Sequence, residues 1–252
     1  PIWPTVVLTA LFPDTFSADE LRETLAPILP ADSLSFEYIG EKDWQAGFEE
    51  SLDPMQFGRR LWVTPDRSLA LPPDAAVIEL SPGLAFGSGS HPTTTMCLEW
   101  LDGLDLTGLN VLDYGCGSGI LGLAAVALGA EHATLIDIDE QAISATLHNA
   151  AANGLTDRVT IELPGETEEP VQHDVLVANI LSGTLIMLGP QLNGLLRPGA
   201  SLALTGILAD QADEVVDAWS EWADLTMTAQ IREWVLLTGC KRSDAARKEA
   251  AV

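Results

Sequence analysis

The stretch LNVLDYGCGSG, residues 109–119, decides the fold of this chain. Its apolar run ends at the acidic residue Asp113, and alternating glycines follow. This pattern predicts a buried strand that turns sharply into a helix from about Ile120. Glycines let a backbone approach a bound group closely, and the first turn of a helix presents unpaired N–H groups. The stretch therefore predicts a ligand site, with a tight turn that holds no ligand as the alternative.

A second apolar run, ATLI at residues 133–136, ends in Asp137, which lies 22 positions after Gly115. In a doubly wound parallel sheet, a strand-end carboxylate at this distance accepts hydrogen bonds from ribose hydroxyls. We therefore expect an α/β sheet that binds a ribose-containing cofactor. If the strand ends later, Asp139 takes this role instead.

The glycine spacing separates two such cofactors. A pyrophosphate-binding turn favours G-x-G-x-x-G, whereas Gly115, Gly117 and Gly119 alternate here and Asp113 precedes them. An acid repels phosphate and suits a cationic ligand. The turn resembles the first motif of the class I S-adenosylmethionine-dependent methyltransferases, which holds the amino-acid end of S-adenosyl-L-methionine. A nicotinamide or flavin dinucleotide is the alternative cofactor.

The composition is strongly acidic, with 12 Lys and Arg against 37 Asp and Glu in 252 residues and a formal net charge of −25. Such a surface repels a phosphate backbone, so we expect a basic protein substrate and no direct nucleic-acid binding. The alternative is that the charge only keeps the protein soluble, for example in a salty cytoplasm. The sequence contains neither a spanning apolar run nor a signal peptide, so we expect a cytoplasmic protein without membrane contact.

The cysteines Cys97, Cys116 and Cys240 are too few and too scattered for a disulfide framework or a metal site. We therefore expect no bound metal, and we interpret Cys116 as a small residue that fits the turn rather than as a catalytic thiol.

The N-terminal residues 1–42 predict a small α+β domain. Residues 5–12 have a strand-like composition, Ser17 and Glu20 form a capping box for a helix from Ala18 to Leu29, and Ser33 to Ile39 predict another strand. This unit is about half of a ferredoxin-like fold. Residues 43–80 follow as a linker helix and strands, and residues 243–252 form a flexible tail.

Residues 82–95 form a loop rich in glycine and hydroxyl side chains, and it runs into a helix that begins near Pro92. A loop of this composition directly before a cofactor-binding segment predicts a lid, with a plain connector as the alternative.

The run from Asp174 to Leu181 is almost wholly apolar and predicts a buried strand. Asn179 is its polar residue at the carboxyl end, where such sheets bind ligands, although it could instead cap the next helix. The other expected elements are helices at 140–153, 183–196 and 209–222, strands at 159–163 and 201–207, a turn at 197–199 and a hairpin at 225–241.

From Asp43 to about Lys241 the chain resembles the PrmA family, methyltransferases that modify the large-subunit ribosomal stalk-base protein eleven. The motifs that carry the resemblance are PGLAFG (82–87), HPTT (91–94), DYGCGSGIL (113–121), DID (137–139) and ANIL (178–181).

The resemblance implies a doubly wound seven-stranded Rossmann-like methyltransferase sheet in residues 81–242. It also implies a monomeric enzyme that transfers methyl groups from S-adenosyl-L-methionine to lysine side-chain and N-terminal amines of a basic ribosomal protein. The predicted cofactor-binding residues are Thr94, Asp113, Gly115, Gly117, Asp137 and Asn179. The predicted catalytic residues are Asn179, Thr94 and His91.

The N-terminus departs from the family pattern. Family members usually carry a complete ferredoxin-like substrate domain ahead of the linker, whereas only a strand-helix-strand half precedes Asp43, and the chain begins at Pro1 without a Met. A reduced recognition domain and a truncated sequence both remain open.

The chemistry implied by the resemblance needs a neutral amine more than a dedicated base, and the side-chain oxygen of Asn179 is the expected acceptor. Two rivals remain. Methyltransferases that act on a nucleobase or a glutamine amide share the Asn but usually follow it with two prolines and an aromatic, in place of Ile180 and Leu181. A dinucleotide-binding Rossmann protein is the second rival.

Overall fold

The computed structural model of the chain describes residues 17–25, 30, 33–35, 54–65, 68–80, 89–166 and 171–243. It consists of two compact units, Pro1–Gly47 and Phe48–Val252. Several predicted segments lie outside the described residues: the strand at 5–12, the linker residues 43–53, the first part of the lid loop at 82–88 and the tail from 244.

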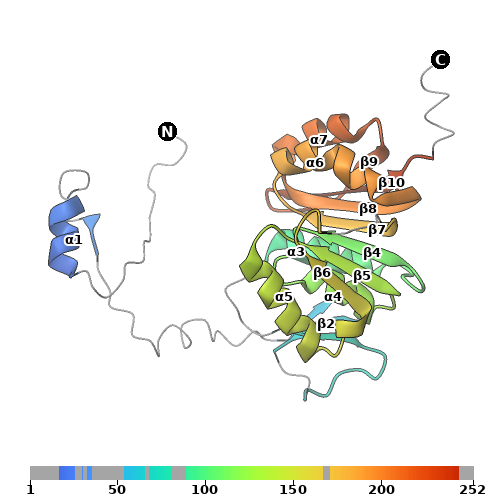
Figure 1. The fold of residues 1–252 in the computed structure, drawn as a ribbon, viewed down its shortest axis with the longest axis horizontal. Coiled ribbons are helices and arrows are strands. Elements are labelled where there is room, and N and C mark those ends of the chain that lie inside the picture. Colours follow the sequence, from blue (N-terminus) through green and yellow to red (C-terminus); the bar gives the residue numbers. More distant parts are fainter. Residues whose placement is uncertain are drawn as a thin grey trace. The chain divides into compact units, whose positions relative to one another are not determined.

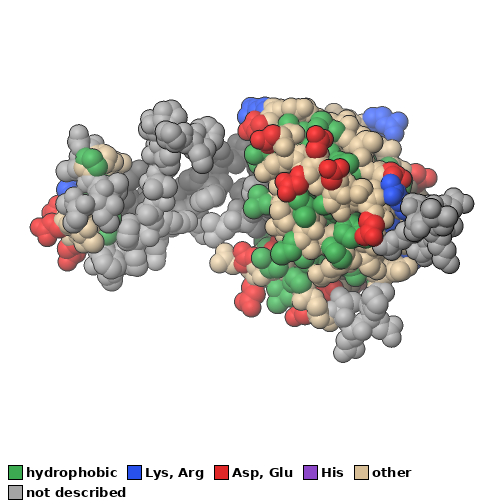
Figure 2. All heavy atoms as spheres, turned by 90° about the horizontal axis from the view of Figure 1, so that it is seen from above, with side chains coloured by type: hydrophobic (Ala, Val, Ile, Leu, Met, Phe, Trp, Pro, Cys, Tyr) green, Lys and Arg blue, Asp and Glu red, His purple; other side chains and the backbone are tan. Residues whose placement is uncertain are grey.

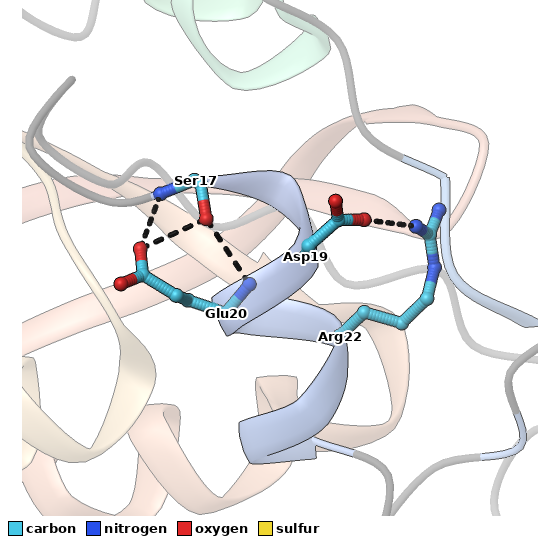
Figure 3. Close-up of polar contacts among 4 residues, drawn as sticks. All are labelled: Ser17, Asp19, Glu20 and Arg22. Atoms are coloured by element: carbon cyan, nitrogen blue, oxygen red, sulfur yellow. Dashed lines mark hydrogen bonds and ion pairs between the residues drawn. The ribbon is translucent and has the colours of Figure 1, made fainter.

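The first unit contains α1 (Ala18–Leu25), which begins at the predicted capping box. Ser17 N and Oγ donate to Glu20 Oε2 at 2.9 and 2.8 Å, and Glu20 N donates to Ser17 Oγ at 3.2 Å (Figure 3). The predicted strand from Ser33 is wrong in its first residues, because Ser33 lies in a 3-10 turn in which its N–H donates to Pro30 O at 3.0 Å. The rest of that predicted strand lies outside the described residues.

The second unit is built on a seven-stranded sheet, as predicted (Figure 1). Its strand order is β6-β5-β4-β7-β8-β10-β9, and β10 runs antiparallel to both of its neighbours while the other pairs are parallel. The strands are β4 (Asn110–Tyr114), β5 (His132–Ile136), β6 (Val159–Glu162), β7 (His173–Asn179), β8 (Leu196–Leu208), β9 (Ala223–Ile231) and β10 (Trp234–Lys241). The order reverses between β4 and β7, and such a switch point is where open α/β sheets bind ligands.

Helices cover both faces of this sheet because successive strand residues point to opposite sides. Val111 of β4 packs in a cluster with α3 (Pro92–Asp102), α4 (Ile120–Ala127) and α5 (Glu140–Ala152). The next residue, Leu112, packs in a second cluster with α6 (Ser182–Gly194) and α7 (Ala212–Trp219). The sheet is therefore doubly wound. No helix in the described part of the chain is long and apolar enough to cross a membrane.

Residues predicted as a linker form a small sheet of β1 (Met55–Phe57), β2 (Leu61–Thr64) and β3 (Ala76–Glu79). Its apolar side chains belong to the same buried cluster as α3 and α4. The carboxylate of Asp102, the last residue of α3, accepts hydrogen bonds from the N–H groups of Arg59, Arg60 and Leu61 at 2.6, 3.0 and 3.1 Å. These bonds fix the end of α3, whose other end reaches the candidate site.

Two predicted boundaries in the C-terminal half are wrong. Arg197, Pro198 and Gly199 lie inside β8 rather than in a separate turn. The strand continues through them, and residues 197–200 bulge out between the paired residues His173–Leu196 and Val175–Ser201. The helix expected from Ala209 to Trp222 begins as a 3-10 turn at Ala209–Gln211 and continues as the shorter α7. The terminal hairpin of β9 and β10 forms as predicted.

Candidate active site

The glycine turn follows β4 and is held against the end of β5. Gly115 N and Cys116 N both donate to Ile136 O, at 2.8 and 3.1 Å. Gly115 has a φ of +79°, and a Cβ on it would lie 2.2 Å from Cγ2 of Ile180. Glycine is therefore required here both for the backbone conformation and to make room for Ile180, a neighbour that sequence reasoning missed.

The carboxylate of Asp137 lies beside this turn. Its Oδ2 accepts from Gly117 N at 2.8 Å, and its Oδ1 accepts from Asp139 N at 3.0 Å. A carboxylate oxygen can accept a second hydrogen bond, so the partly exposed side chain keeps acceptor capacity for a ligand. Asp139 instead caps α5, with its Oδ1 accepting from Gln141 N at 2.9 Å. Of the two acids, Asp137 is the one bonded to the glycine turn.

Asp113 is fully buried beneath the turn. Its Oδ2 accepts from Gly122 N at 2.8 Å, whereas its Oδ1 has no hydrogen-bond partner in the part of the chain that the structure describes. Burial raises the pKa of Asp113 to about 7. The hydrogen bond from Gly122 lowers this pKa, and the charge of Asp137 raises it by a smaller amount. A buried acceptor without a partner fits a site whose ligand supplies a donor or a cation.

Asp113→Asn is expected to stabilise the ligand-free protein at pH 8 by about 1–3 kcal/mol and to stabilise it less at pH 5. The pKa of this carboxyl is raised by folding, so its contribution to stability is fully present below about pH 4 and is lost as the pH rises through about 7. Thermal unfolding of both proteins at the two pH values measures the difference. The same gain at pH 5 and pH 8 would contradict an ionising Asp113 beneath the turn.

The first turn of α3 and the end of β7 bring a second pair of predicted residues together. The buried Thr94 accepts a hydrogen bond through Oγ1 from Nδ2 of Asn179 at 3.4 Å, although the two residues are 85 positions apart. Because Nδ2 faces Thr94, Oδ1 of Asn179 is the atom left to accept from an amine. The alternative in which Asn179 caps the next helix is wrong, since the N-cap of α6 is Leu181 and makes no side-chain cap bond.

His91 is the N-cap of α3. Its Nδ1 accepts from Thr93 N at 3.4 Å and lies 2.7 Å from Thr93 Oγ1, and its ring meets the ring of Trp234 edge-on at 5.2 Å between centroids. These contacts start the helix that carries Thr94 and support Trp234. A catalytic role for His91 stays a prediction.

The thiol of Cys116 is buried inside the turn, 3.6 Å from Oγ1 of Thr146. Burial raises its pKa, with help from the charge of Asp113. A neutral, buried thiol agrees with the interpretation of Cys116 as a packing residue.

Ile180 lies between the glycine turn and the Asn179–Thr94 pair. It follows Asn179 directly, its side chain packs over Gly115, and its N–H donates to Thr205 O at 3.2 Å. Gly206, which has a φ of +82°, lies so near that a Cβ on it would be 2.4 Å from Ile180 O. A glycine inside a strand often marks such a close backbone approach, so Gly206 was a signal that the sequence offered.

Comparisons with known proteins agree with this geometry. The family model described as ribosomal protein L11 methyltransferase (PrmA) matches residues 1–242. The ribosomal protein L11 methyltransferase of Pseudomonas aeruginosa (strain LESB58) is 48% identical over 247 residues, which cover 97% of this chain and 84% of that protein. The chain belongs to the PrmA family.

Other PrmA relatives support the same assignment. The ribosomal protein L11 methyltransferase of Shewanella amazonensis is 44% identical over 246 residues, 96% of this chain and 83% of that protein. The crystal structure of the ribosomal protein L11 methylase of Lactobacillus delbrueckii subsp. bulgaricus superposes with a TM-score of 0.66 at 29% identity, covering 75% of this chain and 99% of that one. The predicted resemblance is confirmed, and the PrmA match also includes the N-terminal unit ahead of Asp43.

Proposed function

We propose that this PrmA-family protein transfers methyl groups from S-adenosyl-L-methionine to lysine side-chain and N-terminal amines of ribosomal protein L11, the basic protein at the base of the large-subunit stalk. It acts as a monomer in the cytoplasm, where residues 1–42 recognise the substrate and residues 81–242 carry out methyl transfer. Family membership supports the reaction class, and the Asn179–Thr94 pair beside the glycine turn is the single observation that supports the site.

The residues around the turn fit the proposed cofactor. The unpartnered Oδ1 of Asp113 suits the cationic amino-acid end, and Asp137 suits the ribose hydroxyls. Gly115, Gly117 and Thr94 would complete the binding site. S-adenosyl-L-methionine supplies a methyl group on a sulfonium that is already activated for transfer.

The protein's own task is then to bind the acceptor amine in its neutral form. A lysine with a reference pKa of about 10.4 costs roughly 4–5 kcal/mol to bind neutral at pH 7, whereas an α-amine costs about 1 kcal/mol. Oδ1 of Asn179 accepts an N–H of the amine without adding a charge that would favour the ammonium. Its Nδ2 bond to Thr94 holds the amide in that orientation, so the lone pair of the amine is free to face the methyl group.

The charge balance supports a basic substrate. With 37 acidic and 12 basic side chains, the protein attracts a positively charged partner at long range and repels copies of itself, which agrees with a monomer.

The function is tested by incubating the protein with purified ribosomal protein L11 and isotopically labelled S-adenosyl-L-methionine, followed by peptide mass spectrometry. We expect labelled methyl groups on lysine and N-terminal amines of L11. Fluorescence titration with S-adenosylhomocysteine and with NAD identifies the cofactor class independently. An L11 without label, or binding of NAD but not of S-adenosylhomocysteine, would contradict the proposal.

A further inference from the structure

A cavity of about 480 Å³ lies at the carboxyl ends of β7 and β8. Its walls come from the start of α6, the end of β8 with the 3-10 turn that follows it, and the first residue of β10. The apolar part of the lining consists of Leu181, Met187, Leu208 and Trp234, and among the described residues no Asp, Glu, Lys or Arg lines the cavity. This volume falls in the range of pockets that bind small groups, about 300–1,000 Å³.

Two residues of the cavity lining contact residues of the candidate active site. Gly206, which lines it, lies against the backbone of Ile180, the residue that follows Asn179. Trp234, on another wall, meets the ring of His91, the residue at which α3 and its Thr94 begin. The cavity therefore lies next to Ile180 and His91, the residues that adjoin Asn179 at the end of β7 and the first turn of α3.

The rim is apolar and exposed. Leu181 and Met187 are each 70% exposed, an arrangement that keeps apolar surface in water unless a partner covers it. Leu181 is also the N-cap of α6 without a capping side chain, so the helix start gains no hydrogen bond from this residue. The exposed apolar side chains at this rim are typical of a contact surface.

The chain segments that contribute Gln211 and Trp234 to the cavity carry more acidic than basic side chains. Residues 209–222, which include the cavity residue Gln211, carry five Asp and Glu and no Lys or Arg. Glu233 and Arg232 precede Trp234 in the adjacent turn, so the balance of these flanking charges stays negative. Figure 2, which looks onto the side of α6 and α7, shows acidic side chains among hydrophobic ones.

On the basis of the proposed function, we propose that this cavity receives the aliphatic stem of the acceptor lysine, with Leu181 and Met187 as specificity-determining residues. A lysine carries its amine on a flexible four-carbon stem that packs well on apolar walls, while the charged neighbours of that lysine in a basic substrate segment would match the acidic chain segments beside the cavity. The stem passes Leu181 and Met187, and the amine ends beside Asn179. An N-terminal α-amine has no such stem, so the cavity favours lysine.

Leu181→Arg and Met187→Arg place a repelling charge on the rim at exposed positions, where the fold tolerates it. We expect each variant to lower kcat/KM for lysine methylation of L11 at least tenfold, mainly through KM, while the Kd for S-adenosylhomocysteine stays within twofold. Leu181→Met, which conserves volume and apolar character, should recover most of the kcat/KM that Leu181→Arg loses. Leu147→Arg is the matched control, since Leu147 is 49% exposed on α5 outside the cavity, and it should also stay within twofold.

Two failures are distinguishable in this experiment. If the unchanged protein labels no lysine of L11, the proposed function falls, and this inference falls with it. If the unchanged protein labels lysines and both rim variants do so as well as Leu147→Arg, the cavity is not the lysine site and only this inference is overturned.

Discussion

Asn179→Asp is expected to lower the rate of lysine methylation at pH 7 by about 100-fold, because a carboxylate beside the amine raises the amine pKa by roughly 1–3 units. The substitution keeps the size of the side chain, and Thr94 can donate its hydroxyl to the new carboxylate, so the melting temperature should change little. Initial rates with saturating L11 from pH 7 to pH 9.5, together with circular dichroism, measure both effects. The deficit should shrink as the pH rises, since more of the amine is then neutral.

Asn179→Ala removes the acceptor without adding charge, and it should reduce turnover more than cofactor affinity if the contact matters mainly in the transition state. Thr94→Ser is the matched control, because it keeps the hydroxyl that receives Nδ2 of Asn179. If both Asn179 variants react at the rate of the parent protein, Asn179 takes no part in the reaction. If both variants unfold, Asn179 has a structural role only.

The local elements of the site could be predicted from the sequence because their signals are local. The apolar run before Asp113 forms β4, the glycines form the turn, and α4 begins at Ile120 as expected. Asp137 directly follows β5 and lies next to Gly117, and Asn179 is the last residue of β7. Each of these positions depends on residue type and spacing within one strand-turn-helix unit.

The contacts between elements could not be predicted in this way. Ile180 fills the space above Gly115, and the carboxylate of Asp102 binds three N–H groups of the β1–β2 hairpin, which lies more than 40 positions earlier in the chain. The bulge at 197–200 depends on the register with β7, which a turn-like Arg-Pro-Gly sequence does not reveal. Such features depend on tertiary packing, which overrides local propensity.

Asp137→Ala is expected to weaken the binding of S-adenosyl-L-methionine by about 1–3 kcal/mol, or roughly 5- to 150-fold in Kd, because the ribose hydroxyls lose a charged acceptor. The structure adds a second reason. Oδ2 of Asp137 accepts from Gly117 N at 2.8 Å, so the variant also releases the glycine turn that would hold the amino-acid end. Isothermal titration calorimetry with S-adenosylhomocysteine measures the loss.

Asp137→Asn separates these two effects, since it keeps one acceptor oxygen for Gly117 N but removes the charge, and its Kd should fall between those of the parent and of Asp137→Ala. Asp139→Ala is the matched control. It removes the N-cap bond to Gln141 N, which should lower stability by about 1 kcal/mol without changing the Kd. If Asp139→Ala weakened binding and Asp137→Ala did not, the ribose would lie at the start of α5 rather than at the end of β5. The bond from Gly117 to Asp137 argues for the end of β5, because it places that carboxylate against the turn on which the rest of the cofactor would bind.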